Sequence, residues 1–214
     1  MIRIVNGNRR NDQPRLMDQM FRLRKKTFHD RLKWDVSTIG EYEVDDFDAM
    51  NPLYVLSMHE ETNTVIGSLR LLPTTGPNML ADVFHELLPA GQKIRNPTIW
   101  ESSRYCVDTQ LAEKWGAHGV HRASAELLLA LCEIGMDVGL TFIVTVIDLR
   151  MERILRRLNC AGERIGEPHN YGQVTAIAGL WETSEETLTE LRASSGITDS
   201  VLHSSARDML RTAA

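Results

Sequence analysis

The chain has 214 residues, which is enough for one domain with a hydrophobic core. Its 24 basic and 29 acidic side chains give a formal net charge of −5, which argues against a nucleic-acid binder that relies on a broad basic surface. The three widely spaced cysteines, Cys106, Cys132 and Cys160, form no C-x-x-C pair, which argues against a disulfide framework or a zinc site.

Neither a secretory signal nor a membrane span is expected. The first residues, MIRIVNGNRRND, contain no apolar core of a signal peptide. The most apolar long segment, 125–140, carries Glu126, Glu133 and Asp137, whose burial in a bilayer would be costly. We therefore expect a cytoplasmic protein whose partners include neither nucleic acid nor a membrane.

Hydrophobic periodicity predicts helices that alternate with strands. In chain order these are a helix at 14–32, a hairpin of strands 53–59 and 64–72, a helix at 79–88, a strand at 98–107, a helix from about 120, a strand at 141–147, a helix at 149–158, strands near 164–165 and 174–181, and a helix capped by Thr183 with Glu186. No G-x-G-x-x-G motif follows any strand.

This order predicts an α/β fold: a single-domain three-layer α/β/α arrangement with a mixed, largely antiparallel twisted sheet. We place the domain at 1–194 and a C-terminal tail at 195–214. Apolar residues at helical spacing make the tail a candidate for a docked amphipathic helix: Val201, Leu202, Ala206, Met209 and Leu210.

Charged residues that break the apolar pattern indicate where chemistry occurs. Arg24 falls on the apolar stripe of the first predicted helix, between Phe21 and Phe28, and needs an anion there. A purely structural explanation is that it reaches the helix edge or pairs with a structural carboxylate. The acidic run EYEVDDFD follows soon after, and its apolar residues Val44 and Phe47 suggest a segment half buried against a cation.

Two strands add further charges to this set. Arg70 lies inside the second hairpin strand and requires a carboxylate, for which Asp48 is the candidate. In the strand at 98–107, alternation places Glu101 and Ser103 on one face and Arg104 on the other, unless a bulge re-aims them. With the aromatic side chains of the first helix region, these acids and arginines suit a zwitterionic, cationic small molecule.

The pattern of these residues resembles that of the acyl-homoserine lactone synthases of the LuxI type, from the first helix to about residue 181. The matching motifs are RLLPT at 70–74, FHEL at 84–87 and WESSR at 100–104. The matching positions are Arg24, Phe28, Trp34, Asp45, Asp48, Arg70, Glu101 and Arg104. The resemblance implies a GNAT-like fold and a bacterial enzyme that makes a quorum-sensing signal.

The resemblance also implies a reaction. Such enzymes transfer an acyl group from a thioester to the amine of S-adenosylmethionine and then close the lactone with loss of methylthioadenosine, so both molecules are substrates and no cofactor is expected. By the same resemblance, Arg24, Phe28, Trp34, Asp45 and Arg104 bind S-adenosylmethionine, while Asp48, Arg70 and Ser103 form the scaffold. Glu101 would be the base that deprotonates the amine through a water. The competing role for Glu101 is to anchor Arg24, and both roles are compatible.

The acyl donor would be an acyl-acyl carrier protein or an acyl-CoA. On the helix at 149–158, Met151, Ile154, Leu155 and Leu158 are expected to face inward. The opposite face, with Arg150, Arg153 and Arg157, would dock an acidic carrier protein, although a basic helix face is also commonly just solvated. The segment KWGAHGVHRA at 114–123 resembles the GNAT phosphate-binding turn but lacks its full pattern, which leaves the use of CoA open.

The acyl pocket is less clearly indicated, because apolar residues at regular spacing also form ordinary core. Its candidates are Met79, Phe84, Tyr105, Leu128, Thr145 and Ile147. By resemblance, Tyr105 replaces a usual Phe, and a Thr at position 145 favours a 3-oxo chain. His118 and His121 have no evident third ligand, so no metal is expected.

Three other functions remain as alternatives. A different GNAT acyltransferase would acylate another amine and release no methylthioadenosine. A methyltransferase that uses S-adenosylmethionine would be expected to carry a Gly-rich loop after its first strand, which this sequence lacks. A non-catalytic ligand sensor would keep Arg24 and Trp34 without needing Glu101.

Overall fold

The structure, a computed structural model, describes residues 1–113, 119–157 and 159–211, and for residues 119, 120, 157 and 211 the backbone alone. The chain divides into two compact units. The first consists of Met1–Arg70, Arg104–Ala130 and Asp199–Ala214, and the second consists of Leu71–Ser103 and Leu131–Thr198.

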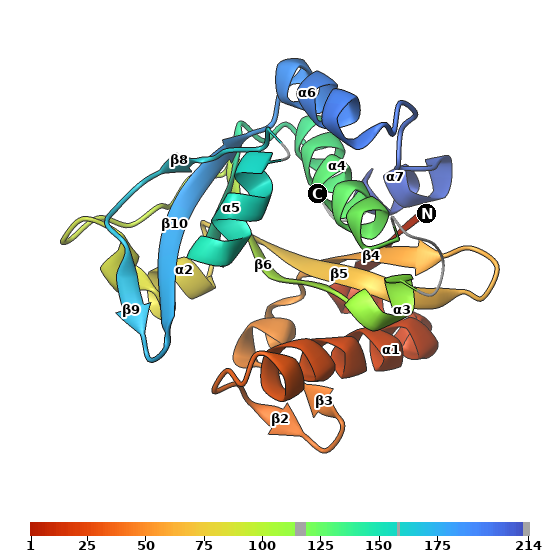
Figure 1. The fold of residues 1–214 in the computed structure, drawn as a ribbon, viewed down its shortest axis with the longest axis horizontal. Helices are drawn as coiled ribbons and strands as arrows, with labels where there is room; N and C mark the ends of the chain where they lie inside the picture. Colours follow the sequence, from red (N-terminus) through yellow and green to blue (C-terminus); the bar gives the residue numbers. More distant parts are fainter. Residues whose placement is uncertain (114–118, 158, 212–214) are drawn as a thin grey trace. The chain divides into compact units, whose positions relative to one another are not determined.

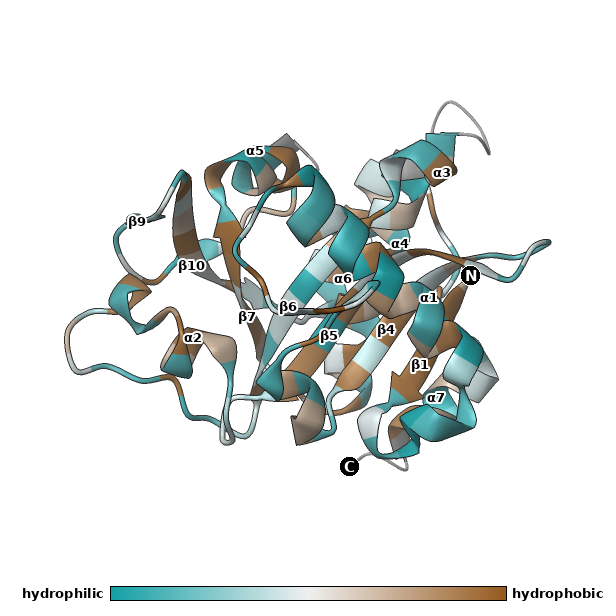
Figure 2. Ribbon diagram, turned by 90° about the horizontal axis from the view of Figure 1, so that it is seen from below, coloured by the Kyte–Doolittle hydropathy of each residue, from teal (hydrophilic) through white to brown (hydrophobic). Residues whose placement is uncertain are grey.

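Neighbouring strands form the framework of the first unit (Figure 1). Strand β1 (Ile2–Asn6) pairs antiparallel with β4 (Leu53–His59), in a register that runs from Ile2↔Ser57 to Asn6↔Leu53. Strand β5 (Thr64–Pro73) lies beside β4 and continues into the second unit. Hydrophobic residues extend along β1 and β4, shown in brown in Figure 2, and supply much of the core of this unit.

Helix α1 (Pro14–Lys25) begins with proline, a residue suited to the first helical position because its missing N–H would have no partner there. Met17, Met20 and Leu23 recur at helical spacing and are buried in the core cluster of the first unit. The helix then widens into a π-helical turn, Lys26–Arg31, which buries Phe28.

The first unit contains several shorter elements. They are the 3-10 turns Gly7–Asp12 and Asp46–Met50, the hairpin of β2 (Thr38–Ile39) and β3 (Tyr42–Glu43), α3 (Thr109–Glu113), the first part of α4 (Gly119–Asp137), and α7 (Ser204–Arg211), which packs against β1.

Parallel and antiparallel pairs both occur among the strands of the second unit. Strand β6 (Ile99–Val107), which ends in the first unit, runs parallel to β7 (Phe142–Asp148), with Glu101 opposite Val144. Strand β10 (Val174–Glu182) pairs antiparallel with β7. The other elements are α2 (Met79–Asp82), the 3-10 turn His85–Leu87, α5 (Leu149–Arg157), β8 (Glu163–Arg164), β9 (His169–Tyr171) and α6 (Glu185–Ser195).

The predicted α/β class with a mixed sheet is confirmed, while several boundaries differ. The elements predicted from the sequence did not include β1, a strand of five residues of which four are buried. The helix predicted at 14–32 changes to π geometry after Lys25, and the one predicted at 79–88 consists of α2 followed by a 3-10 turn.

The cap of α6 is one residue later than predicted. Ser184 is the N-cap, and its hydroxyl accepts a hydrogen bond from the N–H of Thr187. Thr183 instead donates its hydroxyl to the carbonyl of Leu140 at 2.6 Å. Across the described ranges of the chain, no helix is both long and apolar enough to cross a bilayer.

Candidate active site

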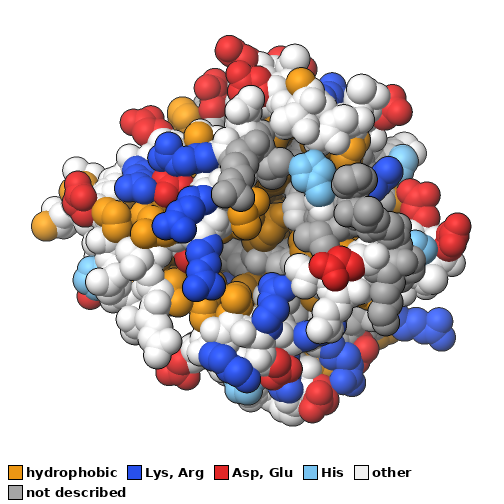
Figure 3. All heavy atoms as spheres, viewed as in Figure 1, with side chains coloured by type: hydrophobic (Ala, Val, Ile, Leu, Met, Phe, Trp, Pro, Cys, Tyr) orange, Lys and Arg blue, Asp and Glu red, His pale blue; other side chains and the backbone are white. Residues whose placement is uncertain are grey.

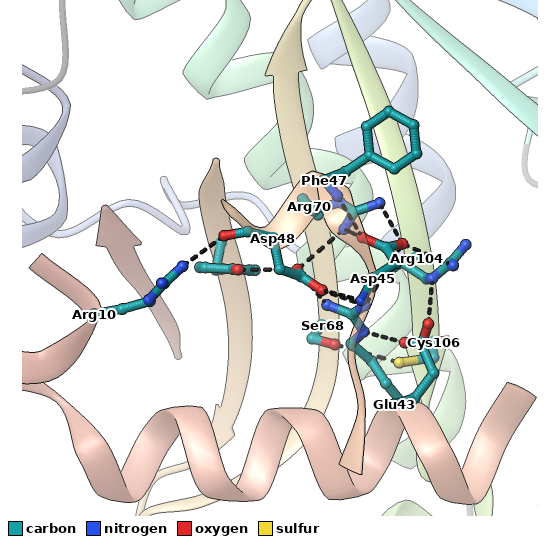
Figure 4. A network of polar contacts seen from close by, with 11 residues as sticks. Arg10, Glu43, Asp45, Phe47, Asp48, Ser68, Arg70, Arg104 and Cys106 are labelled. Carbon is teal, nitrogen blue, oxygen red and sulfur yellow. Dashed lines mark hydrogen bonds and ion pairs between the residues drawn. The ribbon is translucent and has the colours of Figure 1, made fainter. Parts of the chain in front are cut away.

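A network of charged side chains lies in the first unit, and Figure 4 shows it from close by. Arg24 on α1 is only 1% exposed. Its Nε donates to Glu43, and its two terminal nitrogens donate to the two carboxylate oxygens of Asp48 at 2.8 and 2.9 Å. Because an unpaired guanidinium at this depth would cost several kcal/mol, the acidic segment supplies the anions that the position of Arg24 requires.

Asp48 connects most of the network. Its Oδ1 also accepts hydrogen bonds from Arg70 at 3.0 Å and from the hydroxyl of Tyr54 at 2.9 Å, while its Oδ2 accepts from the N–H of Asp45 at 2.9 Å. The pairing of Arg70 with Asp48 is the one predicted from the sequence. Asp45 and Asp48 also form a capping box at the start of the turn Asp46–Met50.

Burial and the charges of the network shift the pKa values of Asp48 and Tyr54 away from their ordinary values. Burial alone would raise the pKa of Asp48, but the guanidinium groups of Arg24 and Arg70 outweigh burial and hold this pKa below its ordinary value. Burial and the neighbouring charge of Asp48 raise the pKa of Tyr54 above its ordinary value. Asp48 is therefore charged, and Tyr54 neutral, throughout the physiological range.

The backbone of β6 changes direction at Arg104. This residue has φ of 55°, a left-handed conformation that is uncommon for an arginine and that breaks the simple alternation of the strand. The Arg104 side chain reaches the acidic segment, where its Nε donates to Glu43 at 3.0 Å and its Nη2 lies 2.8 Å from Oδ2 of Asp45. Because such a conformation costs about 1–3 kcal/mol, we infer that these ion pairs help to hold it.

Of the six charged residues Arg24, Glu43, Asp45, Asp48, Arg70 and Arg104, Asp45 and Arg104 retain accessible surface, with side chains 13% and 11% exposed. Beside them, Phe28 stacks on Trp34 with ring centroids 5.3 Å apart, and the guanidinium carbon of Arg104 lies 5.6 Å from the Phe28 ring centroid. The other charged members are at most 3% exposed: Arg24, Glu43, Asp48 and Arg70. A carboxylate, a guanidinium and two aromatic rings thus meet at a place that can accept a small zwitterion.

Glu101 lies in the second unit and is 1% exposed. Its Oε2 accepts the N–H of Met79 at 2.9 Å, and its Oε1 accepts the N–H of Leu80 at 2.6 Å. Both of its carboxylate oxygens are therefore acceptors for backbone N–H groups at the start of α2. Arg24 takes its anions from the acidic segment, so the anchoring role considered for Glu101 is filled there. Ser103, two residues further along β6, is half-buried.

The residues predicted for the acyl pocket are divided between the two units. In the first unit, Leu128 is buried on α4, and the hydroxyl of Tyr105 donates to the carbonyl of Ser124 on the same helix at 3.4 Å. In the second unit, Met79 is buried and Phe84 packs in a cluster with Val144. Because side chains alternate along a strand, Thr145 and Ile147 lie on the opposite face of β7 from Val144 and Phe84.

The basic face predicted on α5 is present for the side chains that the structure describes. Arg150 and Arg153 are exposed, and Figure 3 shows Lys and Arg side chains gathered over α5. The Arg157 side chain and Leu158 lie outside the described residues. Ile154 was predicted to face inward, and this was wrong, since it is 47% exposed beside Arg150 and Arg153.

Glu152 accounts for this rotation of α5. It is buried against β8, where Arg164 donates to both of its carboxylate oxygens at 2.8 and 2.7 Å, and Arg156 donates to it at 3.1 Å. These bonds, that of Arg164 first, lower the pKa of Glu152 to about 2. A helix that turns a paired glutamate inward must turn a neighbouring side chain outward, and here Ile154 is that side chain.

Sequence reasoning did not single out three polar residues that the structure places in these networks. Glu43 is fully buried between Arg24 and Arg104, Tyr54 donates to Asp48, and Asn78 caps α2. The signal for Glu43 was its place in the acidic run between apolar residues. The signal for Asn78 was its position just before the predicted helix, which is typical of an N-cap.

Two of the sequence-based expectations fall partly on undescribed residues. Residues 114–118 of the segment compared with a phosphate-binding turn, His118 among them, lie outside the described ranges. Within residues 1–113, 119–157 and 159–211, no group of three or more His, Cys, Asp or Glu side chains is arranged to hold a metal ion.

Comparisons with known proteins converge on one family. The family model for autoinducer synthases matches residues 8–191. An acyl-homoserine-lactone synthase of Agrobacterium fabrum is 43% identical over 163 residues, which cover 76% of this chain and 77% of that protein. The crystal structure of the acyl-homoserine lactone synthase LasI is 30% identical with a TM-score of 0.79, covering 90% of this chain and 94% of the other.

A more distant structure adds information on the fold. A CoA-dependent acyl-homoserine lactone synthase, BjaI, solved with S-adenosylmethionine and isopentyl-CoA, has a TM-score of 0.81 at 23% identity and covers 99% of both chains. These neighbours have the GNAT-like fold that the sequence predicts.

Proposed function

This chain belongs to the autoinducer synthase family, and we propose that it transfers an acyl group from a thioester to the amine of S-adenosylmethionine and then closes the lactone. The observation that carries the proposal is the partly exposed pair of Asp45 and Arg104 beside the stacked rings of Phe28 and Trp34. S-adenosylmethionine has a sulfonium, an ammonium and a carboxylate, and each of these has a matching side chain in this set.

The buried members of the network have a supporting role in this proposal. Glu43, Asp48, Arg24 and Arg70 are almost inaccessible, so they hold Asp45 and Arg104 in place instead of meeting the ligand. We therefore propose that Arg24, which was predicted to bind S-adenosylmethionine, supports the site without contacting the ligand. A site whose charged groups are already oriented loses little free energy to rearrangement when its ligand binds.

Two chemical steps follow in order. The ammonium of S-adenosylmethionine must lose a proton before its nitrogen can attack, and Glu101 accepts that proton through a water. The nitrogen then attacks the thioester carbonyl, the C–S bond of the thioester breaks, and the donor leaves as a thiol. In the second step the carboxylate oxygen attacks its own γ-carbon, the bond from that carbon to the sulfonium breaks, and methylthioadenosine leaves. Ring closure is intramolecular and depends mainly on positioning.

Further parts of the proposal concern the rest of the chain. Residues 1–194 form the synthase domain and 195–214 a tail, and both S-adenosylmethionine and the thioester are substrates in the cytoplasm, with no separate cofactor. The candidate contacts of the acyl chain are Met79, Phe84, Tyr105, Leu128, Thr145 and Ile147, but Thr145 and Ile147 lie on the opposite face of β7 from Phe84. One chain cannot contact both faces, and we propose that it lies on the side of Phe84. The BjaI structure holds isopentyl-CoA, so an acyl-CoA donor belongs in every assay beside an acyl-acyl carrier protein.

The direct test combines the pure protein with S-adenosylmethionine and a panel of acyl-carrier and acyl-CoA thioesters of different lengths, with and without a 3-oxo group. We expect an acyl-homoserine lactone and methylthioadenosine in equal amounts, both identified by mass. An acylated amine without methylthioadenosine would instead indicate another N-acyltransferase. A complete lack of acylated product with every donor would contradict the proposal.

For the donor we propose that the arginine face of α5, Arg150, Arg153 and Arg157 with the exposed Ile154, docks an acidic carrier protein. The double variant Arg150→Glu, Arg153→Glu should raise the KM for an acyl-carrier donor about tenfold or more, because it reverses the charge that attracts the partner. The KM for S-adenosylmethionine should stay within about twofold. Steady-state kinetics with each substrate varied in turn measures both values.

A matched control reverses two exposed arginines of the first unit. Arg3 and Arg15 are exposed, so Arg3→Glu with Arg15→Glu changes the net charge equally and should leave both KM values nearly unaltered. Added salt should raise the KM of the unaltered protein for the carrier donor more than that of the α5 variant. Equal effects of the α5 variant on both substrates would show that α5 is not the docking face.

A further inference from the structure

The short helix α2 has side-chain partners for the first N–H groups of its backbone. These groups have no partner within a helix and must be satisfied from outside it. Glu101 accepts from Met79 at 2.9 Å and from Leu80 at 2.6 Å, while Asn78 accepts from Ala81 at 3.0 Å. Two side chains from different elements thus fix one turn of helix.

Asn78 is tied to the turn that precedes the helix. Its Nδ2 donates to the carbonyl of Gly76 at 2.9 Å and to that of Thr74 at 3.3 Å, and its side chain is almost inaccessible at 1% exposed. Thr74 in turn donates its hydroxyl to the carbonyl of Ile99 on β6 at 2.7 Å.

The result is a ring of hydrogen bonds that begins and ends on β6. It leads from Ile99 through Thr74 and Asn78 to α2 and returns to β6 through Glu101. Because both ends of the ring lie on one strand, α2 cannot rotate over β6 without breaking at least one of these bonds.

Residues proposed to contact the acyl chain lie on this helix and directly after it. Met79 is the first residue of α2 and is 6% exposed. Its carbonyl accepts the N–H of Phe84 at 2.9 Å, and the Phe84 ring packs edge-on against Tyr171 with ring centroids 5.1 Å apart. A change in the orientation of α2 would therefore move Met79 and Phe84 together.

We propose that Asn78 and Glu101 are positioning residues that clamp α2 onto β6 and thereby set the acyl-chain selectivity of the enzyme through Met79 and Phe84. This inference rests on the proposed function. A well-fitted apolar pocket discriminates between substrates that differ by one methylene by about 10–200-fold. If α2 is held less firmly, the positions of Met79 and Phe84 vary more, and this discrimination should fall.

The test uses Asn78, which leaves the proposed base intact. Asn78→Ala removes the acceptor for Ala81 and both donors to the preceding turn. The ratio of kcat/KM for the preferred acyl thioester to that for a chain two carbons longer should fall at least about fivefold. The fraction of folded enzyme cancels in this ratio, so a loss of stability alone would not change it.

Two further variants sharpen the test. Thr183→Val removes a partly buried hydrogen bond elsewhere in the second unit, to Leu140 at 2.6 Å, and should leave the ratio unaltered. Asn78→Ser keeps a hydroxyl oxygen that can accept from Ala81 but loses one of the two donors to the preceding turn, so it is milder, and it decides the question if Asn78→Ala does not fold. It should lower the ratio about threefold.

Each outcome separates the inference from the proposed function. If the unaltered protein makes no lactone, the proposed function fails, whatever the variants do. If it makes lactone but the kcat/KM ratio of the folded Asn78 variant equals that of the unaltered protein within experimental error, the clamp does not set selectivity. A ratio that falls equally in Thr183→Val would also overturn the inference.

Discussion

Replacement of Asp48 by Asn is expected to lower the free energy of unfolding at pH 7 by about 3–5 kcal/mol, because it leaves two buried guanidinium groups with too little negative charge. Asp48 binds Arg24 through both oxygens and also accepts from Arg70 and Tyr54. An asparagine side chain would keep its oxygen but turn an NH₂ group toward a donor. Urea unfolding of the variant and the unaltered protein measures the difference.

Asp46, two residues earlier, provides the matched control. It belongs to the same acidic run but is exposed, so Asp46→Asn should change the unfolding free energy by no more than about 0.5 kcal/mol. If both exchanges have the same effect, the acidic run is a solvated loop and the network contributes little to stability.

The pH dependence of the Asp48 effect has a definite sign. The pKa of Asp48 is lower in the folded protein than in the unfolded chain, so its contribution is fully present above about pH 4 and is lost as the pH falls toward the folded pKa. The gap in stability between the unaltered protein and Asp48→Asn should therefore be smaller at pH 3 than at pH 7. A gap that widens at pH 3 would contradict the charged, paired state of Asp48.

The burial of Arg24 and Arg70 could be predicted from the sequence because each interrupts an apolar pattern of known period. The identity of their partners was harder to predict. In a run of five acids the spacing does not reveal which carboxylates turn inward, and Glu43 is as deeply buried as Asp48. The turn Asp46–Met50, with its capping box, decides this by aiming Asp48 toward Arg24.

The conformation of Arg104 and the rotation of α5 could not be predicted from local patterns. Nothing in the sequence indicates a left-handed arginine inside a strand, because that conformation is disfavoured for this residue type and depends on ion pairs with a distant segment. On α5 the apolar pattern placed Ile154 inward, but the pairing of Glu152 with Arg164 on β8 outweighs it. In both cases a long-range charge pair overrides a local preference.

Strand β6 carries the two residues on which the proposed chemistry depends most. Glu101 and Arg104 are three positions apart, yet one accepts two backbone N–H groups and the other donates to Glu43. In a regular strand, residues three positions apart point to opposite faces. The left-handed conformation of Arg104 interrupts the regular strand at that residue. Strand β6 thus holds a proposed acid–base group and a proposed ligand contact through two separate hydrogen-bond networks.

Replacement of Glu101 by Gln is expected to slow acyl transfer about 10²–10⁴-fold, the range typical of removing a general base. Gln also disturbs the clamp on α2, since its NH₂ group would face the N–H of Met79 or Leu80. Asn78→Ala separates the two effects, because it loosens the same helix while leaving the carboxylate in place. Single-turnover acylation should fall less than about tenfold in Asn78→Ala and far more in Glu101→Gln, with both proteins folded by circular dichroism. Equal losses in the two variants would assign Glu101 to the clamp alone, and a Glu101→Gln enzyme with normal turnover would remove it as the base.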